Sequence, residues 1–187
     1  MPTNHPRQTG FTLVETLVSV CLGAIVAAMA APALGDIIAN SRITTEINNM
    51  AGHLHLARSE AVKRGQRAVI CPSDNGERCL GSGDWAGGYM VFIDADEDRR
   101  RDADEPVVNF HQIDARSVRV NAGTRKTVTY RPTGWAPGSN LTITFCDAYD
   151  RVPPKAVIVS MTGRPRVDHI HPNGGALNCP INAPQNG

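Results

Sequence analysis

Motifs of the common enzyme classes are missing from this sequence of 187 residues. It has no G-x-S-x-G elbow, no phosphate loop, no G-x-G-x-x-G and no H-E-x-x-H. A large net charge is missing too, because the formal charge is +1, and 41% of the residues are hydrophobic. These values are typical of an ordinary folded protein and exclude a disordered or uniformly basic chain. We expect a protein that is not an enzyme and that needs no cofactor.

Charge is nevertheless divided unevenly along the chain. Residues 94–105, DADEDRRRDADE, hold seven acids and three arginines, a net of −4. Residues 106–187 hold nine Lys or Arg and four Asp or Glu, a net of +5. The C-terminal part is therefore where we expect an anionic partner to bind.

The five cysteines lack the spacing of a usual zinc site. Cys21 lies in an apolar run, where we expect an unpaired small hydrophobic residue. The other four suit two disulfides in an oxidising compartment, and reduced thiols or zinc ligands are the alternatives. Cys71 and Cys79 bracket the turn-rich CPSDNGERC, so we expect them to pair and Cys146 to pair with Cys179. The sequence leaves the connectivity open.

One long apolar run lies near the N-terminus. Residues 16–35 are twenty residues without a charge, enough to cross about 30 Å of hydrocarbon as a helix. Such a run occurs in a cleaved secretory signal or in a membrane anchor. The signal is disfavoured because Glu15 lies where its core should be apolar, and because a helical pattern continues past Pro32.

That pattern predicts one helix over residues 12–64. Its second half carries an apolar stripe with steps of four and three residues, formed by Ile43, Ile47, Met50, Leu54, Ala57 and Ala61. Pro32 should kink the helix and Gly65 should end it. After Gly65 the period becomes alternating, which predicts strands at 68–72, 88–94, 107–112, 117–120, 127–131, 140–146 and 155–161. We therefore predict an α+β fold with an antiparallel β-rich part packed on the amphipathic half of the helix.

Several stretches resemble one protein family. GFTLVE at 10–15 and the apolar run after it are similar to the class III signal of type IV pilins and type II secretion pseudopilins. Three further stretches resemble the FimT/GspH family of minor pilins and pseudopilins: LARSEAVKRGQRAVICPSDNGERC at 56–79, GGYMVFIDAD at 87–96 and VSMTGRPRV at 159–167. The resemblance covers nearly all of the chain.

The resemblance implies a lollipop-like pilin. Its parts would be a leader peptide at 1–10, a transmembrane and assembly helix at 11–39, the amphipathic half of the helix at 40–65 and a periplasmic β-rich head at 66–187. Prepilin peptidase would cut after Gly10 and methylate Phe11. The product would lie in the inner membrane and then join a pilus or pseudopilus through other pilins. Glu15 matches the family's glutamate and would neutralise the new α-amino group of Phe11, in its own or a neighbouring subunit.

GRPRV at 163–167 is the candidate for nucleic-acid binding. An extended segment projects Arg164 and Arg166 to the same side, where they can contact neighbouring phosphates. Two solvated surface arginines are the ordinary alternative. FimT proteins linked to natural transformation carry a matching G-R-x-R motif that binds DNA, so the resemblance implies contact with double-stranded DNA. Four other basic residues would widen the patch: Arg125, Lys126, Arg151 and Lys155.

No metal site is predicted. Five acids, Asp94, Asp96, Asp98, Asp102 and Glu105, occupy positions 1, 3, 5, 9 and 12 of an EF-hand-like calcium loop. Arg99 stands where that loop needs glycine, so we favour a solvated hairpin tip. In DHIH at 168–171, a His-x-His pair could bind metal, but ordinary loop residues are favoured, and a disulfide would remove Cys179 as a ligand.

We therefore predict a FimT-like minor pilin of a type IV pilus, at or near the filament tip. It would bind DNA during natural transformation, help to initiate pilus assembly, or do both. The main alternative is a GspH-like type II secretion pseudopilin that contacts other pseudopilins. A remote alternative is a secreted enzyme with a conventional signal cleaved near Ala31.

Overall fold

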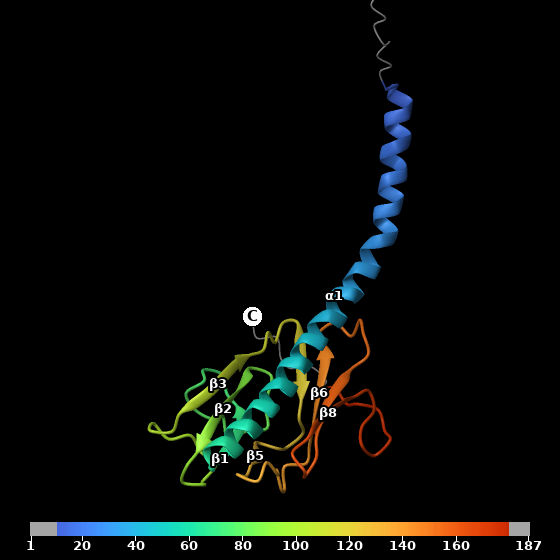
Figure 1. Ribbon diagram of the computed structural model, residues 1–187. Coiled ribbons are helices and arrows are strands. Elements are labelled where there is room, and N and C mark those ends of the chain that lie inside the picture. The colour runs from blue at the N-terminus through green and yellow to red at the C-terminus, as the bar shows by residue number, and fades with distance from the viewer. Residues whose placement is uncertain (1–10, 180–187) are drawn as a thin grey trace, which may run out of the picture. The chain divides into compact units, whose positions relative to one another are not determined.

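The computed structural model describes residues 11–179. These residues form one helix, α1 (Leu13–Arg64), followed by eight strands (Figure 1). The chain divides into two compact units, one ending at Ile38 and the other beginning at Ala39. The predicted cleavage residue Gly10 lies outside the described residues.

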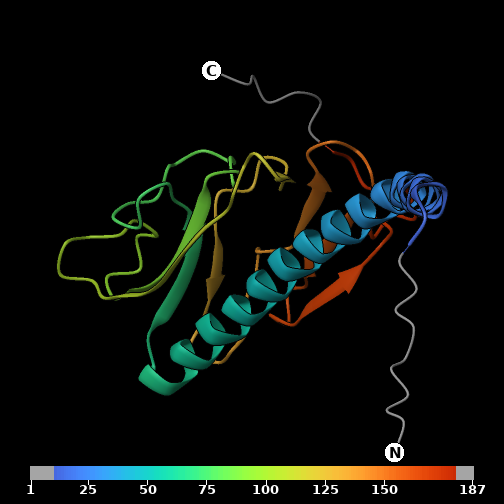
Figure 2. The same cartoon turned by 90° about the horizontal axis from the view of Figure 1, so that it is seen from above.

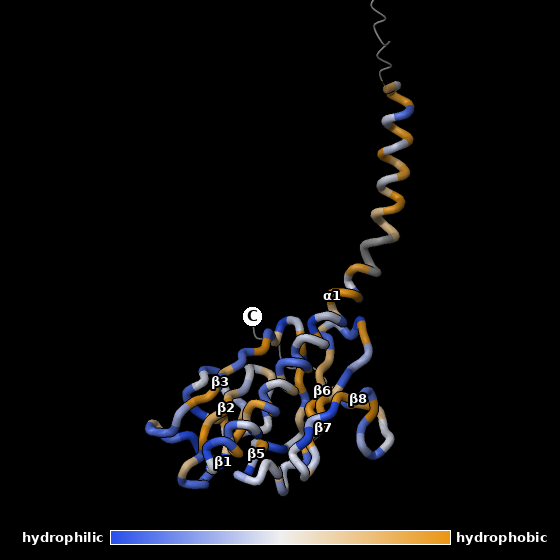
Figure 3. The backbone as a smooth tube through the Cα atoms, viewed as in Figure 1, coloured by the Kyte–Doolittle hydropathy of each residue, from blue (hydrophilic) through white to orange (hydrophobic). Residues whose placement is uncertain are grey.

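The N-terminal unit contains the apolar part of α1 (Figure 3). Thr12 precedes the helix, and its hydroxyl accepts a hydrogen bond from the backbone N–H of Glu15 at 3.2 Å, which makes Thr12 an N-cap. By length and composition α1 can cross a membrane, a test that signal sequences also pass. The helix continues through Pro32, and a kink there stays a prediction.

The second half of α1 carries the predicted apolar stripe. All six of its side chains are at most 2% exposed: Ile43, Ile47, Met50, Leu54, Ala57 and Ala61. They belong to one core cluster with residues of both sheets, and Figure 2 shows this half of α1 lying across both. The helix ends at Arg64 as predicted, and Gly65 follows with a φ of 66°.

The first sheet has the strand order β3-β2-β1-β5, with every neighbouring pair antiparallel. Its strands are β1 (Arg67–Pro72), β2 (Gly88–Asp94), β3 (Val107–Gln112) and β5 (Val128–Tyr130). A second apolar cluster, formed by Val69, Cys71, Met90 and Phe92, packs with Cys79 apart from the main core. A Cys71–Cys79 disulfide ties the loop after β1 to this cluster and confirms the first predicted pairing.

The second sheet has the order β4-β6-β7-β8 and is also antiparallel. Its strands are β4 (Val118–Asn121), β6 (Leu141–Asp147), β7 (Lys155–Val159) and β8 (Pro165–Asp168). The Cys146–Cys179 disulfide ties the C-terminal segment to β6 and confirms the second pairing. All seven predicted strands are present within two residues of their predicted ends. The eighth, β8, was not among them, because its side chains are partly or fully exposed and show no apolar alternation.

Candidate functional site

The start of α1 presents the predicted assembly residues. Phe11 is 85% exposed, and Glu15 lies exposed in the first helical turn. Thr12 and Glu15 have the spacing of a capping box. A carboxylate here also interacts favourably with the helix dipole, by about 0.3–1 kcal/mol. Glu15 thus stabilises the helix start while remaining open to a positive charge outside the helix.

Gly163 sets the backbone path into the GRPR segment. Its φ is 74°, and an added Cβ would lie 2.6 Å from the carbonyl oxygen of Gly134 and 2.7 Å from Cε1 of Tyr130. The Tyr130 hydroxyl donates a hydrogen bond to the Gly163 carbonyl at 3.1 Å. Burial raises the pKa of Tyr130, which keeps this hydroxyl protonated as a donor. The first residue of the motif therefore has a structural role that needs no DNA.

Of the two arginines of the motif, Arg164 directly precedes β8, the edge strand of the second sheet, and Arg166 lies on it. Both are exposed, and Arg166 lies opposite Ile158 of β7. The Arg166 side chain is 59% exposed and forms an ion pair with Asp168 at 3.1 Å. Within residues 11–179 the Arg164 side chain makes no hydrogen bond or ion pair. Both predicted phosphate ligands therefore lie at an open sheet edge in contact with solvent.

A hollow of about 700 Å³ lies beside Arg166 on the second sheet. Arg125, Arg166 and His171 line it together with apolar side chains such as Met161. The Arg125 guanidinium donates a hydrogen bond to the carbonyl oxygen of Gly138. Two arginines thus line one concave surface, which favours an anionic ligand.

Arg151 and Lys155 are not brought to this surface. The Lys155 ammonium donates to Asn40 Oδ1 at 2.8 Å and to Thr44 Oγ1 at 3.0 Å, both on α1. Arg151 lies in the turn between β6 and β7, with its guanidinium 5.1 Å from the centre of the Tyr149 ring. That turn precedes Lys155, which is the first residue of β7. The β8 residues, which come after Gly163, begin opposite the last residue of β7. The wide patch that includes these two residues is therefore split in the folded chain.

In the DHIH segment Asp168 ends β8, and the other three residues have the contacts of a loop. Asp168 binds Arg166 through Oδ2 and accepts backbone N–H groups through Oδ1. His171 Nδ1 lies 2.7 Å from Asn173 Oδ1, and Cys179 is held in its disulfide. Among the described residues these side chains do not converge on a common point.

A polar cluster joins α1 to the first sheet. His53 Nδ1 lies 2.8 Å from the Tyr89 hydroxyl, and His111 Nε2 lies 2.7 Å from Glu46 Oε2. Burial, and secondly the proximity of His111, lowers the pKa of His53. Burial raises the pKa of Tyr89 well above its usual value, and Glu46 adds to this. From the lowered pKa of His53 we expect this contact between helix and sheet to weaken in acid.

Comparison with protein families decides the class of the chain. The model described as Type II transport protein GspH matches residues 46–163, more than half of the sequence. The chain belongs to the GspH family. A second model, the prokaryotic N-terminal methylation motif, matches residues 5–31. This motif implies processing by prepilin peptidase and assembly with other pilins or pseudopilins. GspH-family proteins are structural subunits of the pilin and pseudopilin class rather than enzymes.

Two crystal structures of the type IV minor pilin FimU from Pseudomonas aeruginosa are similar to this GspH-family chain. One match covers 75% of this chain and 96% of the FimU chain, with 17% identity and a TM-score of 0.56. The other covers 75% and 98%, with 19% identity and a TM-score of 0.51. The likeness confirms the predicted pilin-like α+β fold. A search of curated proteins found no match.

Two features of this GspH-family chain were missed by reasoning from sequence. One is the hollow, because its lining comes from segments far apart in the chain, such as Arg125 and Arg166. The other is the contact of Gly163 with Gly134 and Tyr130. The position of a glycine two residues after the last predicted strand could have indicated a turn with positive φ.

Proposed function

We propose that this GspH-family chain is a minor pilin of a type IV pilus that binds double-stranded DNA through Arg164 and Arg166. The observation that best supports this is the exposure of both arginines, Arg164 just before an edge strand and Arg166 on it, next to a hollow that Arg125 also lines. Arginine forks suit phosphate oxygens, and phosphate contacts carry no sequence information. We therefore expect salt-dependent binding with little sequence preference.

In this proposal the N-terminal segment serves assembly. Prepilin peptidase removes residues 1–10 and methylates Phe11, and helix residues 11–39 anchor the chain in the inner membrane. Residues 40–65 and the head at 66–187 lie in the periplasm until the subunit enters the filament, at or near its tip. The match to the methylation motif and the apolar first half of α1 support this order.

The DNA contact is tested by removing both charges. Arg164→Ala with Arg166→Ala, in the full chain in mild detergent, should weaken duplex binding in a low-salt mobility shift. Two lost phosphate contacts should also reduce the slope of log K against log salt by about 2. Lys63→Ala with Arg116→Ala is the matched control, since it removes two exposed charges elsewhere. Unchanged affinity in the first variant, or an equal loss in the control, contradicts the assignment.

The Asp168 ion pair offers a test in the opposite direction. Asp168→Asn removes the charge that Arg166 faces while keeping an Oδ1 acceptor for the N–H groups of His169 and Ile170. DNA binding should become stronger, because Arg166 no longer shares its charge with a carboxylate. Weaker or unchanged binding means that Arg166 does not contact DNA.

The family match supports a second candidate function, a type II secretion pseudopilin that contacts other pseudopilins, because the matching model is described as a type II transport protein. A deletion strain complemented with the two-arginine variant separates the candidates. Loss of DNA uptake with intact pili supports the DNA role, and loss of pili supports a role in initiating assembly. Loss of secretion alone supports the pseudopilin.

Assembly through Glu15 has its own test. Glu15→Val should leave membrane insertion intact and impair incorporation into filaments, because the α-amino group of Phe11 loses its partner. Glu15→Gln keeps the length and polarity of the side chain and removes only the charge. If Glu15→Gln subunits enter filaments normally, the charge is not what assembly requires.

A further inference from the structure

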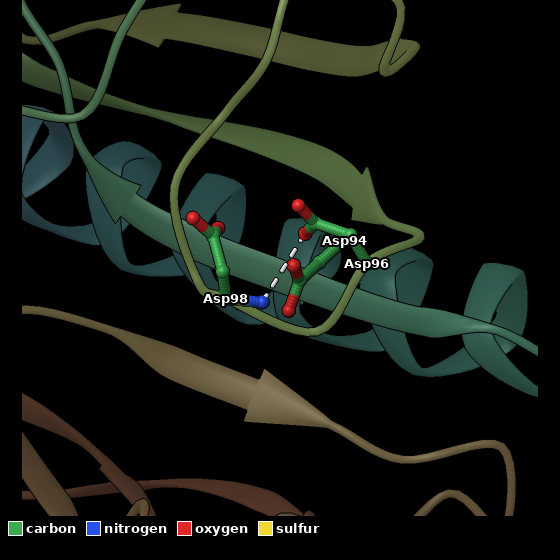
Figure 4. Close-up of side chains that lie close together, drawn as sticks. All are labelled: Asp94, Asp96 and Asp98. Atoms are coloured by element: carbon green, nitrogen blue, oxygen red, sulfur yellow. Dashed lines mark hydrogen bonds between the residues drawn. The ribbon is translucent and has the colours of Figure 1, made fainter.

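The acidic loop between β2 and β3 brings three carboxylates together. Asp94 ends β2, and Asp96 and Asp98 follow at alternate positions (Figure 4). One oxygen from each lies within 4.8 Å of the other two. Oxygens on opposite sides of a calcium ion are separated by about 5 Å, twice the usual calcium–oxygen distance. The spacing therefore suits one calcium ion.

Asp94 supplies an independent indication of a ligand. Its side chain is fully buried, and its Oδ2 atom has no hydrogen-bond partner. Its Oδ1 atom accepts the backbone N–H of Arg99 at 3.2 Å. A buried carboxylate oxygen without a partner is unfavourable, because burial has removed its water without replacement. A cation bound to this oxygen, with Asp96 and Asp98 as further ligands, would satisfy it.

The sequence-based objection to calcium was Arg99 in place of glycine, and the backbone removes it. Arg99 has a φ of 66°, the left-handed conformation for which an EF-hand loop uses glycine at this position. In this conformation its N–H reaches the carboxylate of Asp94, the first residue of the loop. The loop thus adopts the required left-handed backbone conformation with arginine, rather than glycine, at this position.

The arginines of this loop do not neutralise the aspartates. Arg101 donates to three backbone carbonyl oxygens, those of Glu77, Ala103 and Glu105. Among the described residues, no ion pair joins any arginine to Asp94, Asp96 or Asp98. The negative charge of the cluster is therefore available to a cation.

Glu105 closes the base of the loop. It is 4% exposed, and its two carboxylate oxygens accept the backbone N–H groups of Ala95 at 2.6 Å and Asp102 at 3.1 Å. It adds negative charge beneath Asp94 and keeps the two arms of the loop together. Asp96 and Asp98 are exposed, which leaves a path for the ion and room for water ligands.

We propose that Asp94, Asp96 and Asp98 bind one Ca²⁺ ion, with water completing its coordination. All three protein ligands are oxygens, which excludes a preference for soft metals. With few protein ligands, we expect the weak binding of extracellular calcium modules, with a Kd of about 10⁻⁴–10⁻³ M. The bound ion would order the β2–β3 loop.

The test is calorimetric titration of CaCl₂ into the full chain in mild detergent, with thermal unfolding in parallel. Calcium should bind once per chain and raise the Tm. Asp96→Asn with Asp98→Asn should abolish both effects while leaving the fold intact, because both side chains are exposed. Asp104→Asn, an exposed acid of the same loop outside the cluster, should leave both effects unchanged.

Several results would overturn the proposal. The first is that the folded wild-type chain shows neither heat of binding nor a Tm shift at millimolar CaCl₂. The second is that the Asp104→Asn control loses calcium binding and the Tm shift as completely as the double variant does. The third is that the double variant retains both effects in full. An equal response to MgCl₂ would also overturn it, since that indicates charge screening rather than a site sized for calcium.

Discussion

Replacing Gly163 by alanine should destabilise the head strongly, for two separable reasons. The φ of 74° places an L-residue in the left-handed region, which costs about 1–2 kcal/mol. The new methyl group would also lie 2.6 Å from the Gly134 carbonyl oxygen and 2.7 Å from Cε1 of Tyr130. Crowding of this kind typically costs about 1–3 kcal/mol. The free energy of unfolding should therefore fall by about 2–5 kcal/mol.

A matched control isolates the second reason. Gly138 has a φ of 72° but no atom within 4 Å of an added Cβ, so Gly138→Ala carries only the backbone penalty of about 1–2 kcal/mol. Equilibrium urea unfolding of the full chain in detergent measures both variants, followed by tryptophan fluorescence, to which the buried Trp85 and the exposed Trp135 contribute. Equal losses in the two would refute the crowding at Gly163. No loss in either would refute the left-handed conformations.

Three further predictions concern stability. The pKa of His53 is lowered in the folded head, so the unfolded chain binds the proton more readily, and stability should fall as the pH drops below 6.5. His53→Asn should reduce this loss of Tm between about pH 8 and about pH 5, whereas His55→Asn, at an exposed position, should leave it unchanged. Leu54→Ala removes a fully buried side chain and should lower the free energy of unfolding by about 2–5 kcal/mol in urea titrations. Replacing Cys146 and Cys179 by alanine opens a link across 33 residues and should cost about 3–4 kcal/mol, and an unchanged urea midpoint would contradict this.

Much of the fold could be predicted because its signals are local. The apolar residues from Ile43 to Ala61 recur with a helical period. Side chains at this spacing lie on one face of a helix, and that face packs against the core. Each of the seven predicted strands is bounded by turn residues, and the Cys71–Cys79 pair closes a loop that is short in sequence. β8 could not be predicted from the sequence, because an exposed edge strand needs no apolar alternation. Its formation depends on pairing with β7.

The candidate sites divide in the same way. The sequence by itself determined the family, the helix with Glu15 at its start, the pair of arginines after Gly163 and the alternating aspartates, because each is a pattern of neighbours along the chain. Only the tertiary structure decided which charges share a surface. It brings Arg125 and Arg166 to the lining of one hollow, and it turns Lys155 towards Asn40 and Thr44. It also leaves Asp94 Oδ2 buried without a partner, since burial is a property of the packed chain and not of the residues beside it.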